Sequence, residues 1–377
     1  MADTQEKIPL RQRITDQIAE AMRKGQPPWR QPWLGDQNSG HPCNFMSKRR
    51  YNGINVMLLM MSQMAHNLSS KYWGTMNQWR QLGAYVMPKP QGVQHWGTGI
   101  VFFNFIEDKE EGEKKPTKPA GKKGGKKGAG AKPAAKKLRP MTRVYTVFNV
   151  DQVEPPKVEL LAQKPIEKLN EIAKKILHKT YPERVRRDFV AQLIHDAVKA
   201  KLDALKVGVV EHVGNTDPDF GPAEELFTAS GARIKHAGDR AFYSPGDDSV
   251  TLPPKKLFKN ISHYYETGFH ELVHWCVVPS RLDLQKQGPY AFNELVAEIG
   301  ACYLAAELNL PLADEMLPES QKYLKAWLER MGNDVKFIFD AARVASKAAD
   351  YLLKFVRPEE GQEDEEDVDT AQERAAS

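Results

Sequence analysis

Two histidines four residues apart constrain this chain more than any other feature of its sequence. They lie in His270-Glu271-Leu272-Val273-His274, within an apolar pattern of helical spacing that ends at Pro279. Residues four apart share one face of a helix, so both imidazoles can bind a single zinc ion. Glu271 is then placed to take a proton from a metal-bound water. The motif predicts a buried zinc-binding helix with Glu271 as general base.

A later acidic pair can complete such a site, because a catalytic zinc ion needs a third protein ligand and an open position. Glu294 and Glu298 lie one turn apart in a second helical pattern, from about 290 to 308. One carboxylate can therefore bind the metal while the other orients a ligand histidine. The alternative is a pair of amphipathic helices whose polar residues simply face solvent.

The distance between the two segments resembles that in the gluzincin metallopeptidases. This resemblance implies that Glu294 is the third metal ligand and that Glu271 is the general base. It also implies that Glu298 orients the ligand His270 without binding the metal itself. We expect one Zn²⁺ per chain, although the same residues would accept other divalent metals. Tyr243 and Tyr290 are candidates for stabilising an oxyanion, and ordinary packing explains either equally well.

Length and composition favour a soluble protein with more than one domain. The 377 residues are 41% hydrophobic, which is enough for two cores, yet no apolar run approaches the roughly 18 residues of a membrane span. The polar N-terminus does not resemble a signal peptide. Three widely spaced cysteines argue against a disulfide framework and a thiolate zinc site. We expect a cytoplasmic protein without membrane attachment.

Charge is unevenly distributed along the chain. Residues 1–104 carry twelve Lys or Arg against five Asp or Glu, and residues 114–139 hold ten lysines and one arginine without an acid. The tail after Arg357 is the reverse, with nine acids and one arginine. This segregation predicts a polyanion-binding front half and a disordered acidic tail.

The front half also interleaves its cations with aromatic rings and amides. Cations that neutralise phosphates beside rings that stack on unpaired bases are what single-stranded nucleic acid requires. Because tryptophans are usually buried, at least half of these rings are expected in the core, Trp79 among them. The candidate contacts are Trp29, Arg30, Trp33, Lys48, Arg49, Arg50, Tyr51, Asn52, Asn55, Lys71 and Trp73.

Two β-rich runs of matching length, 101–106 and 143–150, predict a hairpin. The Lys-, Gly-, Ala- and Pro-rich residues 107–140 between them cannot bury enough surface to fold, so we interpret them as a disordered insertion. Whether its lysines attract DNA or it is only a solvated tether is left open by the sequence. Helices are expected at 7–24, at 164–206 with a break at Tyr181-Pro182, at 321–331 and at 334–355, and short strands at 232–236, 240–244 and 249–252.

The whole chain resembles the ArdC-type antirestriction family over roughly residues 8–310. The resemblance rests on the metal-site residues and on Tyr51-Asn52-Gly53-Ile54-Asn55, Gln78-Trp79, residues 147–152, 241–245, 264–267 and 280–283. It implies an α+β protein with an N-terminal α+β single-stranded-DNA-binding domain, residues 1–155, and a mostly helical zincin-like metallopeptidase domain with a small sheet, residues 156–357. The acidic tail, 358–377, and the lysine-rich insertion depart from a minimal member.

Two functions follow from this resemblance. In the first, an antirestriction protein of a mobile element, plasmid or phage, binds single-stranded DNA and hydrolyses a peptide bond, with a host restriction component as a candidate substrate. In the second, the protein protects single-stranded DNA by occupying it, and zinc only stabilises the fold. The intact Glu271 favours the enzyme, because a structural zinc site has no need of a base.

Overall fold

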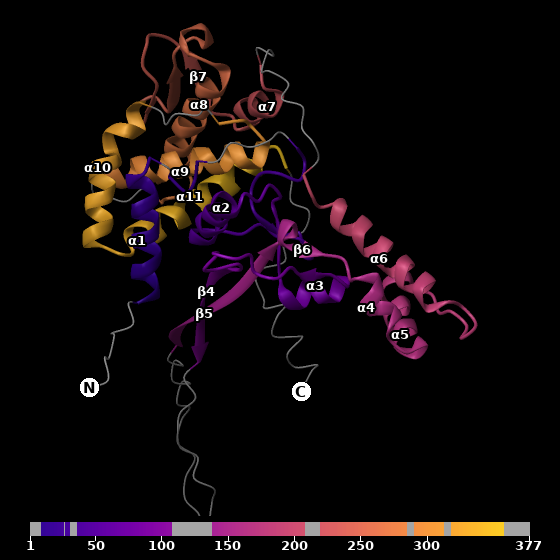
Figure 1. The fold of residues 1–377 in the computed structure, drawn as a ribbon. Helices are drawn as coiled ribbons and strands as arrows, with labels where there is room; N and C mark the ends of the chain where they lie inside the picture. Colours follow the sequence, from indigo (N-terminus) through magenta and orange to yellow (C-terminus); the bar gives the residue numbers. More distant parts are fainter. Residues whose placement is uncertain are drawn as a thin grey trace, which may run out of the picture.

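The computed structural model describes residues 9–25, 27–30, 36–107, 138–207, 219–284, 290–312 and 318–357. Its helices and small sheets confirm the expected α+β class (Figure 1). Trp33, most of the lysine-rich insertion and the acidic tail lie outside the described residues. No helix within those described ranges is both long enough and apolar enough to cross a membrane.

A four-stranded sheet organises the front half, in the order β1-β2-β5-β4. Its strands are β1 (Cys43–Asn44), β2 (Tyr72–Thr75), β4 (Thr98–Glu107) and β5 (Leu138–Asn149). The antiparallel pairing of β4 with β5, from Thr98 opposite Val147 to Glu107 opposite Leu138, confirms the predicted hairpin. Backbone pairing continues past the apolar runs, so Glu107 and residues 138–140 belong to the strands and not to the insertion.

Three helices accompany this sheet: α1 (Leu10–Arg23), α2 (Ile54–His66) and α3 (Met76–Leu82). The Asn55 side chain fixes α2 on the sheet, because its amide donates to the Val101 carbonyl at 2.9 Å and accepts from the Val101 N–H at 2.8 Å. A capping box between Thr75 and Gln78 starts α3, whose Trp79 is fully buried as expected.

The helices after the sheet pack on the front half. They are α4 (Val158–Ala162), α5 (Ile166–Leu177) and α6 (Arg187–Asp203), preceded by η1 (Val150–Gln152) and by β6 (Val153–Glu154), which pairs with β3 (Tyr85–Val86). Their apolar residues share one core with Trp79, Phe148 and Val150. Gly83 permits this contact, since a Cβ there would lie 2.6 Å from Ile176 Cδ1 and 3.0 Å from Val198 Cγ2.

The predicted boundary at residue 155 therefore does not separate the two cores. In Figure 1, α4, α5 and α6 lie together, away from α8, α10 and α11. The proline pair Pro155-Pro156 lies at this boundary, and proline pairs often end a structural unit. A sequence does not reveal that the apolar face after such a break turns back onto the preceding sheet.

The second core surrounds two long helices, α8 (Ile261–Cys276) and α9 (Tyr290–Leu308). Around them lie α7 (Gly221–Ala229), η2 (Lys255–Leu257), α10 (Pro318–Asn333), α11 (Phe337–Leu353) and a sheet of order β7-β9-β8. The strands β7 (Arg233–His236), β8 (Phe242–Ser244) and β9 (Ser249–Leu252) match the three predicted runs. From the front half, α1, α2 and Trp29 also join this core.

Candidate metal centre

The two helices that carry the predicted metal ligands approach each other closely. Asn260 caps α8, where its side chain accepts from the His263 N–H at 2.9 Å. Gly300 of α9 faces Val273 of α8, and a Cβ on Gly300 would lie 2.8 Å from Val273 Cγ2. This close approach brings one turn of α9 opposite the histidines of α8.

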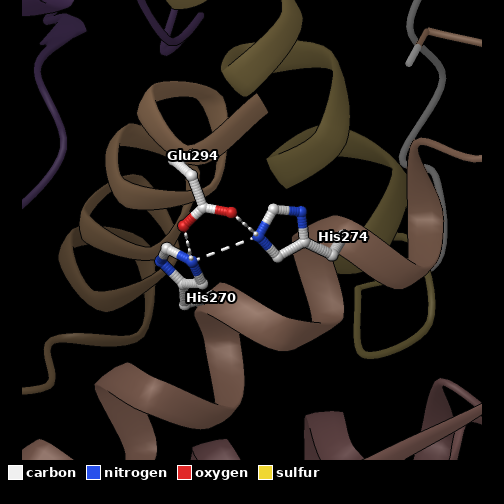
Figure 2. Close-up of side chains that lie close together, drawn as sticks. All are labelled: His270, His274 and Glu294. Atoms are coloured by element: carbon white, nitrogen blue, oxygen red, sulfur yellow. Dashed lines mark hydrogen bonds and ion pairs between the residues drawn. The ribbon is translucent and has the colours of Figure 1, made fainter. Parts of the chain in front are cut away.

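His270, His274 and Glu294 point toward one another at this contact (Figure 2). The two histidine Nε2 atoms are 3.2 Å apart. Glu294 Oε2 lies 3.4 Å from His270 Nε2, and Glu294 Oε1 lies 3.4 Å from His274 Nε2. The two histidines therefore offer one nitrogen each, and Glu294 offers its carboxylate, to a common point.

The size of this triangle fits a small divalent cation. A tetrahedral zinc ion with bonds of about 2.0–2.1 Å separates its ligand atoms by about 3.3–3.4 Å. Glu294 Oε1 is buried and, among the described residues, has no hydrogen-bond partner. A buried carboxylate oxygen facing an imidazole nitrogen normally needs a proton or a cation between them. The donor set suits zinc, and it would also hold manganese.

Electrostatics at the triangle favour a bound positive charge. Burial alone would lower the pKa of His270, but Glu294, together with the charges of Glu271 and Glu298, raises it above its ordinary value. Burial would raise the pKa of Glu294, yet His270 and His274 hold it well below its usual range. A metal cation at this point would likewise be stabilised by the Glu294 carboxylate.

Glu271 follows His270 on α8 and is 8% exposed. Its charge contributes to the raised pKa of His270. Tyr290 lies one turn before Glu294 on α9, and burial together with the neighbouring Glu294 carboxylate raises the pKa of its hydroxyl. Tyr243 instead donates to Asp248 at 2.9 Å, beside Arg281. Of the two candidate tyrosines, Tyr290 is the one whose pKa responds to one of the three clustered residues.

Glu298 occupies a different position from the one expected. Its carboxylate accepts from the Ser320 hydroxyl and lies 3.4 Å from Arg30 Nη1, whose main partner is Glu266. Within the described part of the chain, His270 Nδ1 has no hydrogen-bond partner. Glu298 thus affects His270 only through its charge, because the buried guanidinium is the stronger partner. Sequence analysis missed this arrangement, since Arg30 lies far from both acids.

The candidate nucleic-acid contacts divide by exposure. Trp29, Tyr51 and Trp73 are buried, and Asn55 is committed to the Val101 backbone. Arg30 is paired with Glu266, and Arg50 with Glu307 and Asp350, so neither guanidinium faces solvent freely. Lys48, Arg49 and Asn52 are exposed and Lys71 is half-buried. Burial and ion pairs thus remove six of the eleven candidates from the surface.

Two family models match the chain on either side of the α4–α6 region. Residues 9–148 match the N-terminal domain of the anti-restriction factor ArdC, and residues 221–344 match a zincin-like metallopeptidase. Neither match includes residues 149–220, which contain α4, α5 and α6.

Solved structures of the antirestriction ArdC protein from plasmid R388 are similar over nearly the whole chain. The metal-free form is 28% identical, with a TM-score of 0.61, over 92% of this chain and 98% of that one. The Mn(II)-bound form is 27% identical, with a TM-score of 0.59, over 93% and 99%.

Among curated relatives, two DNA primases TraC of Escherichia coli are 29% identical over 93% of this chain. The chain spans only 27% and 20% of these two primases. An uncharacterized protein y4eC of Sinorhizobium fredii is 26% identical over 90% of both chains.

Proposed function

Because the chain belongs to the ArdC-type antirestriction proteins, we propose that its front half binds single-stranded DNA and that its rear half is a metal-dependent peptidase. His270, His274 and Glu294 would hold the cation. The observation that carries this proposal is the cluster of two Nε2 atoms, 3.2 Å apart, each of which lies 3.4 Å from one oxygen of the Glu294 carboxylate. Zinc is the metal we expect there, one per chain.

A cation at this triangle would supply Lewis acidity to a peptide carbonyl and acidify a nearby water molecule. Glu271 is the residue that we assign to the proton: it would take it from the attacking water and return it to the leaving amine. Tyr290, with its hydroxyl beside Glu294, is the candidate donor for the negative charge that develops on the carbonyl oxygen.

The sheet beside α8 would hold the substrate in an extended form. In the order β7-β9-β8, strand β8 is an edge whose pairing partner among the described residues is β9 alone. An extended peptide can add to such an edge through backbone hydrogen bonds. A protein component of the host restriction machinery is the substrate class that we propose, in the cytoplasm of the recipient cell.

A second function is a DNA-binding protein whose metal only stabilises the fold. The burial of His270 and Glu294, which are 7% and 5% exposed, favours it, because a catalytic metal must admit a substrate. His274, whose side chain is 16% exposed and lies three residues after Glu271 on α8, favours the enzyme. The two readings differ in whether Glu271 is needed.

Metal analysis of the purified protein tests the premise that both functions share. We expect about one equivalent of a divalent metal, and a thermal unfolding midpoint that falls when a chelator removes it. DNA binding is tested by titrating the protein with single strands and with duplex over a range of salt. Tighter binding to single strands, with a steep loss in salt, is expected. A purified protein without metal would contradict the proposed metal site. Equal affinity for single strands and duplex would contradict the proposed single-stranded-DNA binding.

A further inference from the structure

One surface of the front half gathers cations that are left without ion pairs. Arg30 and Arg50 form ion pairs with carboxylates. Four other cations form no ion pair with any residue that the structure describes: Lys48, Arg49, Lys71 and Lys201. Three of the four belong to the segment from β1 to β2, and the fourth lies on α6, about 130 residues later. Lys48 and Lys201 line one groove, and Lys71 shares the Tyr72 ring with Lys48.

This groove has an apolar interior and a volume of about 420 Å³. Its lining combines apolar side chains with two lysines, and Phe45, Met46, Lys48, Leu82, Lys201 and Leu205 are its main residues. Met46 is 43% exposed, although it is a large apolar side chain. An apolar interior bordered by unpaired cations matches a flexible polyanion that carries flat, apolar faces, which is single-stranded nucleic acid.

One wall of the groove is a rigid turn. The Asn44 side chain accepts from the N–H groups of Met46 and Ser47, each at 3.0 Å, and donates to Gln78 at 3.0 Å. Lys48 has a φ of 59°, a left-handed conformation that the turn imposes. The turn therefore fixes the backbone that carries Met46, Lys48 and Arg49, so little backbone entropy is lost when a ligand binds.

Two ammonium groups converge at the edge of the same wall. Lys48 Nζ lies 4.5 Å and Lys71 Nζ 5.6 Å from the centroid of the Tyr72 ring. The ring face offers each ammonium group only a weak attraction, and neither group has an ion-pair partner among the described residues. A phosphate beside Tyr72 would supply the missing negative charge.

The opposite wall is the C-terminal end of α6, and the front half fixes it in place. Asn38 Nδ2 donates to the carbonyls of Ala204 and Lys206, at 3.1 and 2.8 Å. The buried Ser70 hydroxyl donates to the Leu205 carbonyl at 2.7 Å. These bonds hold the backbone that follows α6 against the front half, so that Lys201 and Lys48 both line the groove.

We propose that this groove, between the 44–49 turn and the end of α6, is a binding site for single-stranded DNA. The strand would place its phosphates on Lys48, Lys71 and Lys201 and its bases against Met46 and Leu82. The proposal rests on the proposed DNA-binding function. It extends that function, because α6 lies outside the residues that the two family models match. Residues 158–206 thereby become part of the DNA-binding half.

Charge reversal on the two walls tests the site in the full-length protein. The probe is a fluorescein-labelled oligothymidylate, and anisotropy gives its Kd over a series of salt concentrations. We expect Lys48→Glu and Lys201→Glu each to weaken binding by about tenfold or more, and Lys201→Ala to lower the salt slope by about 0.7. The matched control is Lys347→Glu on the exposed face of α11, which changes net charge equally and should leave Kd within about twofold.

A second measurement does not depend on substitutions. Photo-crosslinking of the wild-type protein to an oligonucleotide containing 5-iodouracil should label peptides from residues 42–50 and 201–206. Crosslinks confined to other parts of the chain would refute the groove as the binding site without refuting DNA binding. The same conclusion would follow if Lys201→Glu had the same Kd for oligothymidylate as Lys347→Glu. A wild-type protein that binds no oligothymidylate would instead refute the proposed DNA-binding function itself. Duplex bound as tightly as the single strand would likewise contradict a role for the apolar interior.

Discussion

The guanidinium group of Arg30 forms a buried ion pair with the carboxylate of Glu266, 236 residues later in the chain. Glu266 lies one helical turn before His270, and Arg30 also approaches Glu298, one turn after Glu294, to 3.4 Å. A side chain of the front half thus links the two helices that carry the proposed metal ligands. Burial raises the pKa of Glu266 to about 7, even though the Arg30 charge opposes this.

Arg30→Met should therefore destabilise the protein strongly. It leaves two buried carboxylates without a cation, which typically costs about 3–5 kcal/mol in the free energy of unfolding. Urea denaturation at neutral pH measures this change, with Arg23→Met on the exposed face of α1 as the control, expected within about 0.5 kcal/mol of wild type. Adding Glu266→Gln and Glu298→Gln to Arg30→Met should recover part of the loss. An Arg30→Met variant as stable as the control would contradict a stabilising role for the ion pairs of Arg30 with Glu266 and Glu298.

Glu294→Ala should remove the metal. The substitution deletes the charged ligand and leaves two histidines, so bound metal should fall from about one equivalent to a small fraction of one. Elemental analysis after dialysis gives the stoichiometry, and calorimetry should show a lower unfolding midpoint for the variant. Glu329→Ala, on the exposed face of α10, is the matched control and should retain the metal. Full metal occupancy in Glu294→Ala would place the ligand elsewhere.

Glu307 should contribute stability that is lost in acid. Burial would raise its pKa, but His41, Arg50 and Arg357 outweigh burial and hold it below its ordinary value. A carboxyl whose folded pKa is depressed stabilises the protein fully above its unfolded pKa, about 4.3, and loses that contribution as pH falls through the folded value. Glu307→Gln should therefore destabilise the protein at neutral pH. Its free energy of unfolding should also fall less than that of the wild type as the pH is lowered into the acid range. Parallel curves for wild type and variant would refute this.

The insertion should be dispensable for folding. Glu107 pairs with Leu138, so a short turn can replace residues 108–137 without altering the register of the hairpin. Loop-closure entropy depends weakly on length, so stability should change by no more than about 2 kcal/mol. Denaturation and metal content measure the outcome. Loss of soluble protein would contradict the hairpin, whereas weaker DNA binding by an intact protein would assign a role to the lysines.

The metal-site helices and the hairpin could be predicted because their signals are local. Histidines four apart on an apolar helix fix their own relative position, and matching β-rich runs fix a pairing. Glu294 could be predicted because it lies one turn from a second acid, Glu298, in a segment that the sequence marks as helical.

The partners of the front-half cations could not be predicted. Arg30, Arg50 and Lys48 look alike in the sequence, yet carboxylates from α8, α9 and α11 bind the two arginines and leave the lysine free. Those carboxylates lie more than 200 residues away, so only the tertiary fold separates a structural cation from one that can meet DNA. The contact between the α4–α6 helices and the front half could not be predicted for the same reason, because Gly83 and the side chains that face it are far apart in the sequence.

Restriction protection in cells that carry Glu271→Gln tests the central claim most directly. Glutamine keeps the shape of the side chain and leaves His270, His274 and Glu294 in place, but its amide cannot accept the proton of an attacking water. The variant should retain metal and single-stranded-DNA affinity in the purified protein and should lose protection of incoming DNA in cells. Protection at the wild-type level by the metal-loaded variant would contradict the peptidase and leave the metal a structural role.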